Sequence, residues 1–390
     1  MSQGLDPLLG VYRLLDAARH VAPSDAPALL DGLCEILGAQ GGRLYVADYS
    51  LQRLQRIDNT GPVGLPQTVA GTLAGRAFSS GEVMVSKGLP TVVLAPLVDG
   101  TTRIGLLELD YEVWDDTLSA LMEPVLAAFV LVLVNRSRYS DHWDRARRTK
   151  PLSAAAEIQW DLLPPLSCST DDFGVGGILE PAYDIGGDSF DYAINGQHLE
   201  FAIVDAVGHG MSAVLMAAAA VNSLRNARRA GLDLPSSYLQ TDRLIQEHFG
   251  RSNFVTGQIG SLDSQTGILT WINAGHVLPM LVRNGTYAGE LACAPSMPFG
   301  MGGPVLEVPM EPLQRGDRVL FYTDGITESL SPDGGRFGVD RLADLLVRAS
   351  LERVPVRETA RRLSENVLEH TAGNLKDDGT LLLVEFRAKE

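Results

Sequence analysis

The sequence has too few basic residues for a protein that binds nucleic acid. It contains 32 lysine and arginine residues against 48 aspartate and glutamate residues, which gives a formal net charge of −16 and a pI near 4.9. Binding to nucleic acid depends on a basic surface that releases counterions, so this balance argues against a nucleic-acid partner. An acidic surface is also repelled by an anionic membrane.

Cysteine is scarce as well. The chain has three widely spaced cysteines, Cys34, Cys168 and Cys293. Their number is odd, and neither a CxxC pair nor a neighbouring histidine accompanies them. This pattern is typical of reduced thiols, and it predicts a cytoplasmic protein without structural disulfides.

Long hydrophobic runs are missing too. Residues 118–134 are the one segment that resembles a membrane span, but Glu123 and Pro124 interrupt it. The unbroken apolar part is shorter than the roughly 20 residues that a bilayer requires, so the segment predicts a buried helix. At the N-terminus, no basic segment leads into an apolar one, which predicts that there is no secretory signal.

The length of 390 residues favours two domains, with three as the alternative. In the first, apolar positions recur at helical spacing over residues 8–37, which predicts two helices. Short alternating stretches then predict strands of a small sheet at residues 43–46, 54–57, 92–97 and 105–109. A helical run over residues 115–148 follows, and its strongly charged last part predicts one long exposed or coiled helix. Together these segments predict an α+β, sensor-sized domain over residues 1–140.

A linker helix is predicted within residues 141–165. Alanines, Glu157 and Gln159 favour helix, and Pro164 ends it. The helix would join the two domains directly, so one hypothesis is that it acts as a switch. The alternative is a helix that packs on its own domain.

The second domain, residues 166–390, is rich in strands. Strands are predicted at residues 177–182, 191–194, 199–204, 254–263, 268–274, 279–283, 318–322 and 380–386. Helices are predicted at residues 211–230, 236–249, 339–351 and 356–370. Because the helices are grouped rather than alternating with strands, the pattern predicts a sandwich of sheets with helices outside.

Acidic turns follow or precede apolar strands of this domain. They are Gly186-Gly187-Asp188, Asp205-Ala206-Val207-Gly208-His209-Gly210, Thr323-Asp324-Gly325 and Asp377-Asp378. Most single Asp-Gly pairs are ordinary turns. As a set, however, carboxylates brought close together repel one another unless a cation compensates them. The set therefore predicts a metal site, and glycines beside it would let the backbone approach an ion or a phosphate.

Seven blocks, six of them in the C-terminal 225 residues and one just before these, give a specific resemblance. In order, they are Glu157-Ile158-Gln159 with Leu162-Leu163-Pro164, Gly186 to Asp191, Asp205 to Gly210, Asn273-Ala274-Gly275-His276, Gly316-Asp317-Arg318 leading into Tyr322 to Glu328, Phe337-Gly338, and Asp377 to Thr380. This part of the chain resembles the SpoIIE/RsbU branch of the metal-dependent PPM (PP2C-like) protein serine/threonine phosphatases. The segment from Gly186 to Phe190 also resembles the GGDEF signature of diguanylate cyclases. This resemblance is weak, because Ser189 stands where the signature has an acidic residue.

The resemblance implies an αββα sandwich with two Mn²⁺ or Mg²⁺ ions at one end of the sheets. Asp188 would bind one ion, Asp205 would bridge both and hold a metal-bridged water as the nucleophile, and the carbonyl of Ala206 would add a ligand. Asp324 and Asp377 would hold the second ion. Oxygen ligands suit Mn²⁺ and Mg²⁺, and the lack of clustered histidine and cysteine argues against zinc.

The remaining residues of the motifs leave alternatives open. His209 is a candidate general acid or a turn residue, because it follows Asp205 by four positions where the eukaryotic relatives have a histidine after two. His276 is expected to shape the turn beside the site or to take part in catalysis. Asp191 and Asp378 would orient ligands, cap turns or touch a third ion, and Gly325 belongs to the same secondary set.

Residues 1–140 resemble a GAF domain in the order of their features. These are Leu73 to Phe78 before Ser79-Ser80-Gly81-Glu82, the strand ending in Ala95-Pro96-Leu97, and Ile104 to Leu109. In that family the sheet carries a pocket for a small molecule or a dimer contact. The resemblance implies a sensor that receives a small-molecule or protein signal, and a homodimer; the alternative is a dimerisation domain without a ligand.

The resemblance also implies a function. Such a phosphatase removes phosphate from a phosphoserine or phosphothreonine of an anti-sigma-factor antagonist, a STAS-domain protein, in a partner-switching pathway of sigma-factor regulation and stress response. The alternative is a catalytically inactive, phosphatase-like scaffold that binds a regulatory partner. The presence of all four predicted metal aspartates argues for the enzyme.

Overall fold

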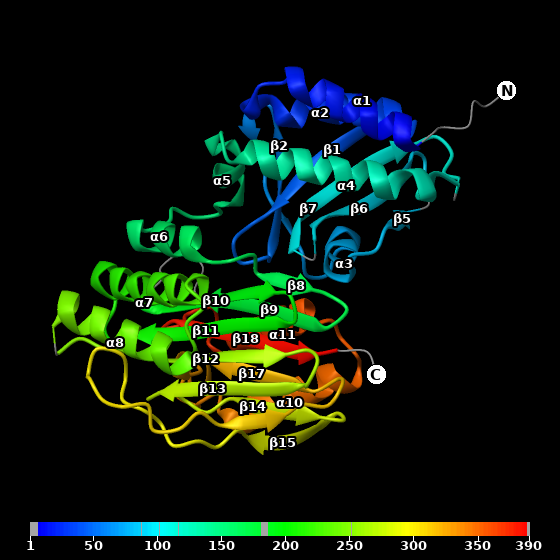
Figure 1. The fold of residues 1–390 in the computed structure, drawn as a ribbon. Coiled ribbons are helices and arrows are strands. Elements are labelled where there is room, and N and C mark those ends of the chain that lie inside the picture. Colours follow the sequence, from blue (N-terminus) through cyan, green and yellow to red (C-terminus); the bar gives the residue numbers. More distant parts are fainter. Residues whose placement is uncertain are drawn as a thin grey trace. The chain divides into compact units, whose positions relative to one another are not determined.

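The structure, a computed structural model, describes residues 7–86, 88–100, 102–115, 117–180, 186–250 and 252–387. The chain forms two compact units, Met1–Pro151 and Leu152–Glu390 (Figure 1). The division falls inside the predicted linker, so that the segment 141–165 is shared between the units. Within the described ranges, no helix is both long and apolar enough to cross a membrane.

The N-terminal unit is an antiparallel sheet with helices on both faces. Its sheet order is β3-β2-β1-β7-β6-β5, and β4 pairs with β2. The strands are β1 (Gly41–Ala47), β2 (Arg53–Asp58), β3 (Gly61–Pro62), β4 (Gln67–Thr68), β5 (Met84–Ser86), β6 (Thr91–Asp99) and β7 (Thr102–Tyr111). The helices are α1 (Pro7–His20), the 3₁₀ helix η1 (Pro23–Ala28), α2 (Leu29–Leu37), α3 (Leu73–Ser80), α4 (Thr117–Ser137) and α5 (Asp141–Arg147). The predicted order of helices, sheet and helices is confirmed.

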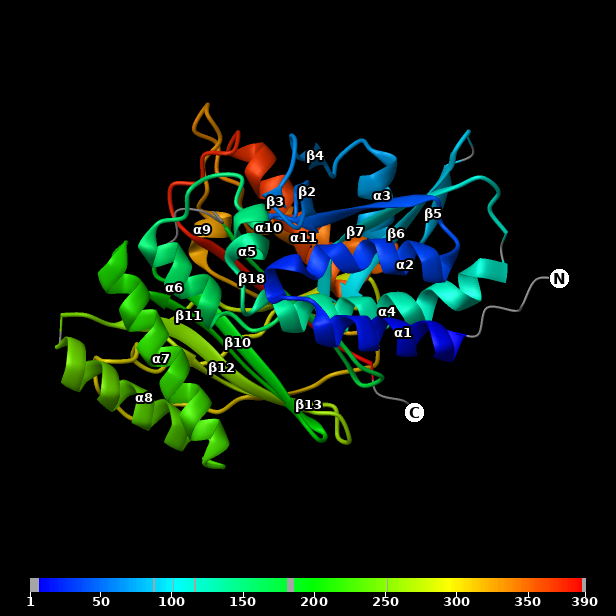
Figure 2. The ribbon, with the colours of Figure 1, turned by 90° about the horizontal axis from the view of Figure 1, so that it is seen from above.

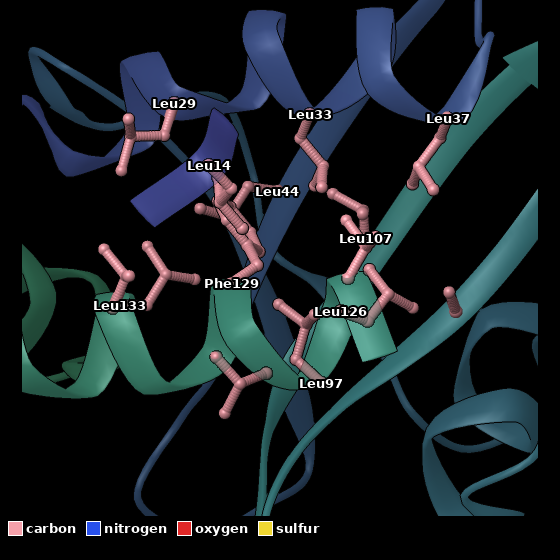
Figure 3. Packing of buried hydrophobic residues seen from close by; sticks show 14 of the residues in the cluster. Leu14, Leu29, Leu33, Leu37, Leu44, Leu97, Leu107, Leu126, Phe129 and Leu133 are labelled. Atoms are coloured by element: carbon pink, nitrogen blue, oxygen red, sulfur yellow. The ribbon is translucent and has the colours of Figure 1, made fainter. Parts of the chain in front are cut away.

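The two faces of this sheet have separate cores. On one face, α1, α2 and α4 pack over Leu44 and Leu107, and Figure 3 shows Leu14, Leu44 and Phe129 pointing toward one another. On the other face, Phe78 of α3 packs against a second cluster. Because side chains alternate across a strand, neighbouring residues of β7 serve the two cores in turn.

The prediction of one long exposed or coiled helix over residues 115–148 is wrong, whereas the buried helix predicted at residues 118–134 is confirmed as part of α4. The chain leaves the helix after Ser137, and the extended backbone of Ser140 caps α5, its side chain accepting a hydrogen bond from the amide of His142. The charged α5 then packs on its own unit. The Arg147 guanidinium lies 4.1 Å from the centre of the Tyr49 ring, whose hydroxyl donates to Asp144 at 3.3 Å.

The C-terminal unit is a four-layer sandwich of two antiparallel sheets between helices. The first sheet has the order β10-β11-β12-β13-β16 and the second β15-β14-β17-β18-β9-β8. The strands are β8 (Ser167–Ser169), β9 (Phe173–Glu180), β10 (Asp188–Asn195), β11 (His198–Ala206), β12 (Val255–Asp263), β13 (Ile268–Ala274), β14 (Met280–Arg283), β15 (Thr286–Glu290), β16 (Met310–Pro312), β17 (Arg318–Tyr322) and β18 (Gly379–Phe386). Residues 181 and 182 of the strand predicted at 177–182 lie outside the described residues.

Helices cover the outer face of each sheet. They are α6 (Ala154–Leu162), α7 (Met211–Arg229), α8 (Leu234–Phe249), the short α9 (Asp324–Thr327), α10 (Val339–Leu351) and α11 (Val356–His370). Side by side in Figures 1 and 2, α7 and α8 cover the first sheet; α10 and α11 cover the second. A third core, which includes Phe190, Phe201 and Phe321, lies between the sheets. The predicted sandwich with outer helices is confirmed.

The helix within the predicted linker, α6, packs on this C-terminal unit. Ser153 caps it, accepting from the amide of Ala156 at 3.1 Å, and Leu162 joins the core under α7. The side chain of Arg225 on α7 donates to the carbonyl of Leu162 at 2.6 Å. This packing matches the alternative of a helix that packs on its own domain, which here is the C-terminal unit. The switch role stays a prediction.

Replacing Phe129 by alanine should destabilise the N-terminal unit by about 3–5 kcal/mol, because the ring is fully buried and its loss leaves a cavity. Hydrogen exchange measured by mass spectrometry on the full chain should show faster exchange in α2 and β7. Leu131→Ala on the same helix is the matched control, since that side chain is 64% exposed. Equal exchange in the two variants would contradict the packing described for α4.

Candidate metal centre

Strand alternation brings the first two carboxylates to one end of the first sheet. Asp188 opens β10 and is the register partner of Asp205 near the end of β11. Phe190 and Ile203 lie in the core between the sheets. Because residues two apart share a face, Asp188 and Asp205 continue this inter-sheet face beyond the apolar side chains.

The second sheet contributes its carboxylates at the same end. Phe321 of β17 and Leu382 of β18 face the inter-sheet core, and Thr323 follows Phe321 on this face. The amide of Thr323 donates to the carbonyl of Thr380 at 3.1 Å, which holds the two strand ends together. Asp324 comes directly after Thr323, and the Asp377-Asp378 pair comes directly before β18.

Four of the five predicted ligand residues line one cavity of about 300 Å³. It is lined by Asp205, Ala206, Val207, Gly208, Phe254, Thr256, Gly275, His276, Val277, Asp324 and Asp377. Asp205 is half-buried, whereas Asp324 and Asp377 are exposed. The fifth predicted ligand, Asp188, is buried and is not part of the lining.

Buried hydrogen bonds hold the carboxylates that lie off the lining. The hydroxyl of Thr323 donates to Asp188 Oδ2 at 2.6 Å, and the same oxygen of Thr323 accepts from the amide of Thr380 at 2.9 Å. Asp378 Oδ2 accepts from the amide of Gly186 at 2.6 Å. Asp378 thus fastens the Gly186-Gly187-Asp188 turn, which agrees with the expectation that it caps a turn.

Two glycines allow the backbone to close around the site. A Cβ atom at Gly187 would overlap the carbonyl oxygen of Ala206, and one at Gly325 would overlap the carbonyl oxygen of Asp378. Any other residue at these positions would push apart the chain segments that carry the carboxylates. The glycines of these turns are therefore required by close backbone approach.

The carboxylates are crowded enough to disfavour their own ionisation. Burial, followed by the charges of Asp324, Asp377 and Asp378, raises the pKa of Asp205 to about 7. The pKa of Asp188 is raised by burial and by Asp205, and that of Asp324 by burial and by Asp377. Burial also raises the pKa of Asp378 to about 6. A cation at this place would relieve the repulsion and favour the ionised form of each group.

The donor set fits a hard divalent cation. Within the described residues, no group of three or more histidine, cysteine, aspartate or glutamate side chains is placed so that it could hold a metal ion by itself. Mg²⁺ does not need such a group, since it keeps several waters and binds through one or two carboxylates. Carboxylate oxygens and the Ala206 carbonyl meet this requirement, and a soft-metal site would need the cysteines that lie elsewhere.

His276 is held as a neutral ring at the side of the cavity. Its Nε2 lies 3.1 Å from the carbonyl of Tyr322, which only accepts, so Nε2 carries the proton. Its Nδ1 then accepts from the hydroxyl of Thr256 at 3.0 Å. Burial lowers the pKa of His276 from 6.5 to about 4, which agrees with this neutral form.

The turn that carries His276 is closed by Asn273. The Asn273 side chain accepts from the amide of His276 at 2.7 Å and donates to its carbonyl at 2.9 Å. The Asn273-Ala274-Gly275-His276 block is therefore a self-bonded turn that presents the ring. This is the turn-shaping role considered for His276.

The structure does not bring His209 and Asp191 into the cavity. His209 is exposed in the turn before α7, and its ring forms no hydrogen bond or ion pair within the described part of the chain. Asp191 lies on the helix-facing side of β10, where Arg225 and Arg228 pair with its two oxygens at 2.7 and 2.9 Å. These guanidiniums already neutralise Asp191.

Two threonines near the carboxylates were missed by sequence reasoning. Thr323 bonds Asp188, and Thr256 bonds His276, as described above. Thr323 stands inside the Thr323-Asp324-Gly325 block, two residues after the apolar Phe321. Because side chains two apart share a face of a strand, this spacing could have predicted that Thr323 faces the same side as Phe321. Thr256 lies in β12, outside every motif block, and only the pairing of β12 with β11 brings it to Asp205.

Comparisons with known proteins agree with this geometry. Residues 195–387 match the family described as Stage II sporulation protein E (SpoIIE). Protein IcfG of Synechocystis sp. is 21% identical over 264 residues, covering 60% of this chain and 41% of its own. The phosphoserine phosphatase RsbU of Bacillus subtilis is 21% identical over 243 residues, covering 60% of this chain and 69% of its own. The chain thus spans less than half the length of IcfG.

A solved structure shows the same fold. The SiaA-PP2C domain of Pseudomonas aeruginosa is 22% identical and superposes with a TM-score of 0.51, covering 60% of this chain and 94% of that domain. The predicted PP2C-like sandwich is confirmed for the C-terminal unit, whereas the GAF-like character of the N-terminal unit stays a prediction. The sequence match therefore makes residues 195–387 part of a SpoIIE-type PPM phosphatase domain, and the C-terminal unit has the PP2C-like fold.

Proposed function

We propose that the chain is a metal-dependent phosphoserine and phosphothreonine protein phosphatase. The observation that carries the proposal is the meeting of Asp205, Asp324 and Asp377 at one cavity, at the end of a PP2C-like sandwich. In this proposal two ions, Mn²⁺ or Mg²⁺, are held by Asp188, Asp205, Asp324, Asp377 and the carbonyl of Ala206. Bound there, the ions would polarise the phosphoryl group and lower the pKa of a water molecule.

The charge of the cavity explains why activity would require metal. A phosphomonoester dianion is repelled by a lining that carries Asp205, Asp324 and Asp377. Cations compensate this charge, so substrate binding and metal binding become linked. The exposed position of Asp324 and Asp377 at the cavity leaves the site open to a phosphorylated side chain on another protein.

The residues around the carboxylates would keep the site in shape during turnover. Thr323 fixes the orientation of Asp188, and Asp378 fixes the turn that carries it. With Nε2 donating to Tyr322 and Nδ1 accepting from Thr256, neutral His276 would position β12 and β17 rather than transfer a proton.

The finer part of the proposal concerns the substrate and its control. The resemblance to the SpoIIE/RsbU branch supports a phosphorylated STAS-domain, anti-sigma-factor antagonist as substrate in a cytoplasmic partner-switching pathway. A small-molecule or protein signal at the N-terminal unit would regulate the phosphatase.

We further infer a homodimer through the N-terminal unit and α6. Sedimentation as a monomer at micromolar concentration would argue against it.

Incubation with phosphorylated STAS proteins and Mn²⁺ or Mg²⁺ tests activity and substrate together. Asp324→Asn should lower the turnover of phosphoprotein and of p-nitrophenyl phosphate by at least about a hundredfold, since it removes a metal ligand. The fold should remain intact, because asparagine removes a charge that neighbouring carboxylates repel. Asp344→Asn, an exposed change on α10, is the control. No turnover by the wild-type chain with either metal would favour the inactive scaffold instead.

His209→Gln tests the general-acid hypothesis. Because the ring is exposed and outside the cavity lining, we expect kcat on a phosphoserine substrate to fall less than about tenfold. A general acid matters most for a poor leaving group, so kcat should be compared between phosphoserine and p-nitrophenyl phosphate. A loss of roughly a hundredfold confined to phosphoserine would establish His209 as the acid.

His276→Gln should change the pH dependence of stability. Between pH 6.5 and about pH 4 the unfolded chain binds a proton at His276 that the folded chain does not, so this residue lowers stability as the pH falls through that window. The variant should therefore lose less stability than the wild type between pH 7 and pH 5. Denaturant unfolding of both metal-free proteins measures this, and the shared carboxylates cancel in the comparison. Equal losses would show that His276 is not held neutral.

A further inference from the structure

A second, larger cavity lies at the opposite end of the strands that carry the acidic residues. It has a volume of about 740 Å³ and is lined by Asn284, Gly285, Arg315, Gly316, Arg318, Ser350, Leu351, Arg353, Pro355, Glu385 and Arg387. Arg318 opens β17, whose other end leads to Asp324, and Glu385 lies near the end of β18, which starts next to Asp378. The two cavities are therefore separated by the length of this strand pair, which is central in the second sheet (Figure 1).

The lining is rich in arginine, although the chain as a whole is strongly acidic. Four arginines face the cavity with a single carboxylate, that of Glu385. Two of the four form ion pairs with that carboxylate: Arg318 lies 3.0 Å from Glu385 Oε1, and Arg387 lies 2.6 Å from Glu385 Oε2. Arg318 is also buried and donates to the carbonyl of Val354 at 2.7 Å. This ion-paired group forms a fixed floor whose charge is already positive.

The other two arginines of the lining, Arg315 and Arg353, do not pair with this carboxylate. The side chains of Arg315 and Arg353 are exposed, and neither guanidinium forms a hydrogen bond or ion pair with the residues that the structure describes. The turns that carry them are nevertheless held in place. The amide of Gly316 donates to Phe386 at 2.8 Å, and that of Arg353 donates to Ser350 at 3.0 Å. Unpaired positive charge is thus presented at the cavity from two fixed turns.

The size and the remaining lining favour a small molecule over an extended polymer. Small-molecule sites occupy about 300–1,000 Å³, and they combine an apolar wall with a few convergent polar groups. Leu351, which is 65% exposed, and Pro355 supply apolar surface, while Asn284 and Ser350 supply polar groups. Nucleic acid would require a basic surface that continues beyond the cavity, and the net charge of −16 argues against one.

We propose that this cavity binds a small molecule that carries two or more phosphate groups. Guanidinium groups match phosphate oxygens with paired hydrogen bonds, and their charge persists at every physiological pH. Arg315 and Arg353 would contact the phosphates directly, above the floor formed by Arg318, Arg387 and Glu385. The site is separate from the metal centre, and it does not depend on the activity proposed for that centre.

Calorimetric titration of the full chain with pyrophosphate, ATP and inorganic phosphate tests this site. EDTA is present throughout, so that no metal recruits phosphate to the carboxylates. We expect pyrophosphate and ATP to bind more tightly than inorganic phosphate, and binding to weaken as salt is added. The double variant R315E/R353E should weaken pyrophosphate binding by at least about tenfold, since it replaces two charged hydrogen-bond donors.

The matched control is R229E/R243E, which makes the same change of charge at exposed arginines of α7 and α8. Its affinity for pyrophosphate should stay within about twofold of wild type. Should the glutamate variant fail to fold, R315Q/R353Q removes the same donors with a smaller change of charge. The proposal is overturned if no probe binds, if the control weakens binding equally, or if only a single-stranded RNA oligonucleotide binds at Arg315 and Arg353.

Discussion

Electrostatic repulsion among carboxylates is the constraint around which the C-terminal unit is organised. Burial and mutual proximity raise the pKa of Asp188, Asp205, Asp324 and Asp378, so the metal-free site holds charges that disfavour one another. The fold tolerates this because hydrogen bonds from Thr323 and from the amide of Gly186 hold two of these groups in place. The free energy needed to keep the site assembled comes from the cores between and outside the sheets.

The same constraint explains why the site sits where two sheets end together. The first sheet brings Asp188 and Asp205 to its end, and the second brings Asp324 and the Asp377-Asp378 pair. Only the face-to-face packing of β10 and β11 against β17 and β18 unites them. Close backbone contacts at Gly187 and Gly325 lock this arrangement. The chemistry of the centre is therefore a property of the sandwich rather than of any single motif.

Most strands and helices that carry the site could be predicted from the sequence, because the spacing of apolar residues in a strand or a helix is a local pattern. The apolar stretches before Asp205 and Asp324 predicted strands that end at those residues, and the structure has β11 and β17 there. Edge strands such as β15 and β16 were missed, since short strands with exposed faces leave little pattern. The break before α5 was missed because Ser140 caps a helix through local bonding that hydrophobic spacing does not register. The roles of Thr256 and Asp191 depend on contacts between distant segments, which no local pattern encodes.

The pairing of β17 with β18 places acidic residues at one end of the two strands and arginines at the other. Such a separation of charge contributes an electric dipole along the strand direction. A charged partner that approaches in solution would experience a torque before any contact forms, and cations in the acidic cavity would reduce it. The orientation in which this unit meets other molecules is thus coupled to the ionic content of its own cavity.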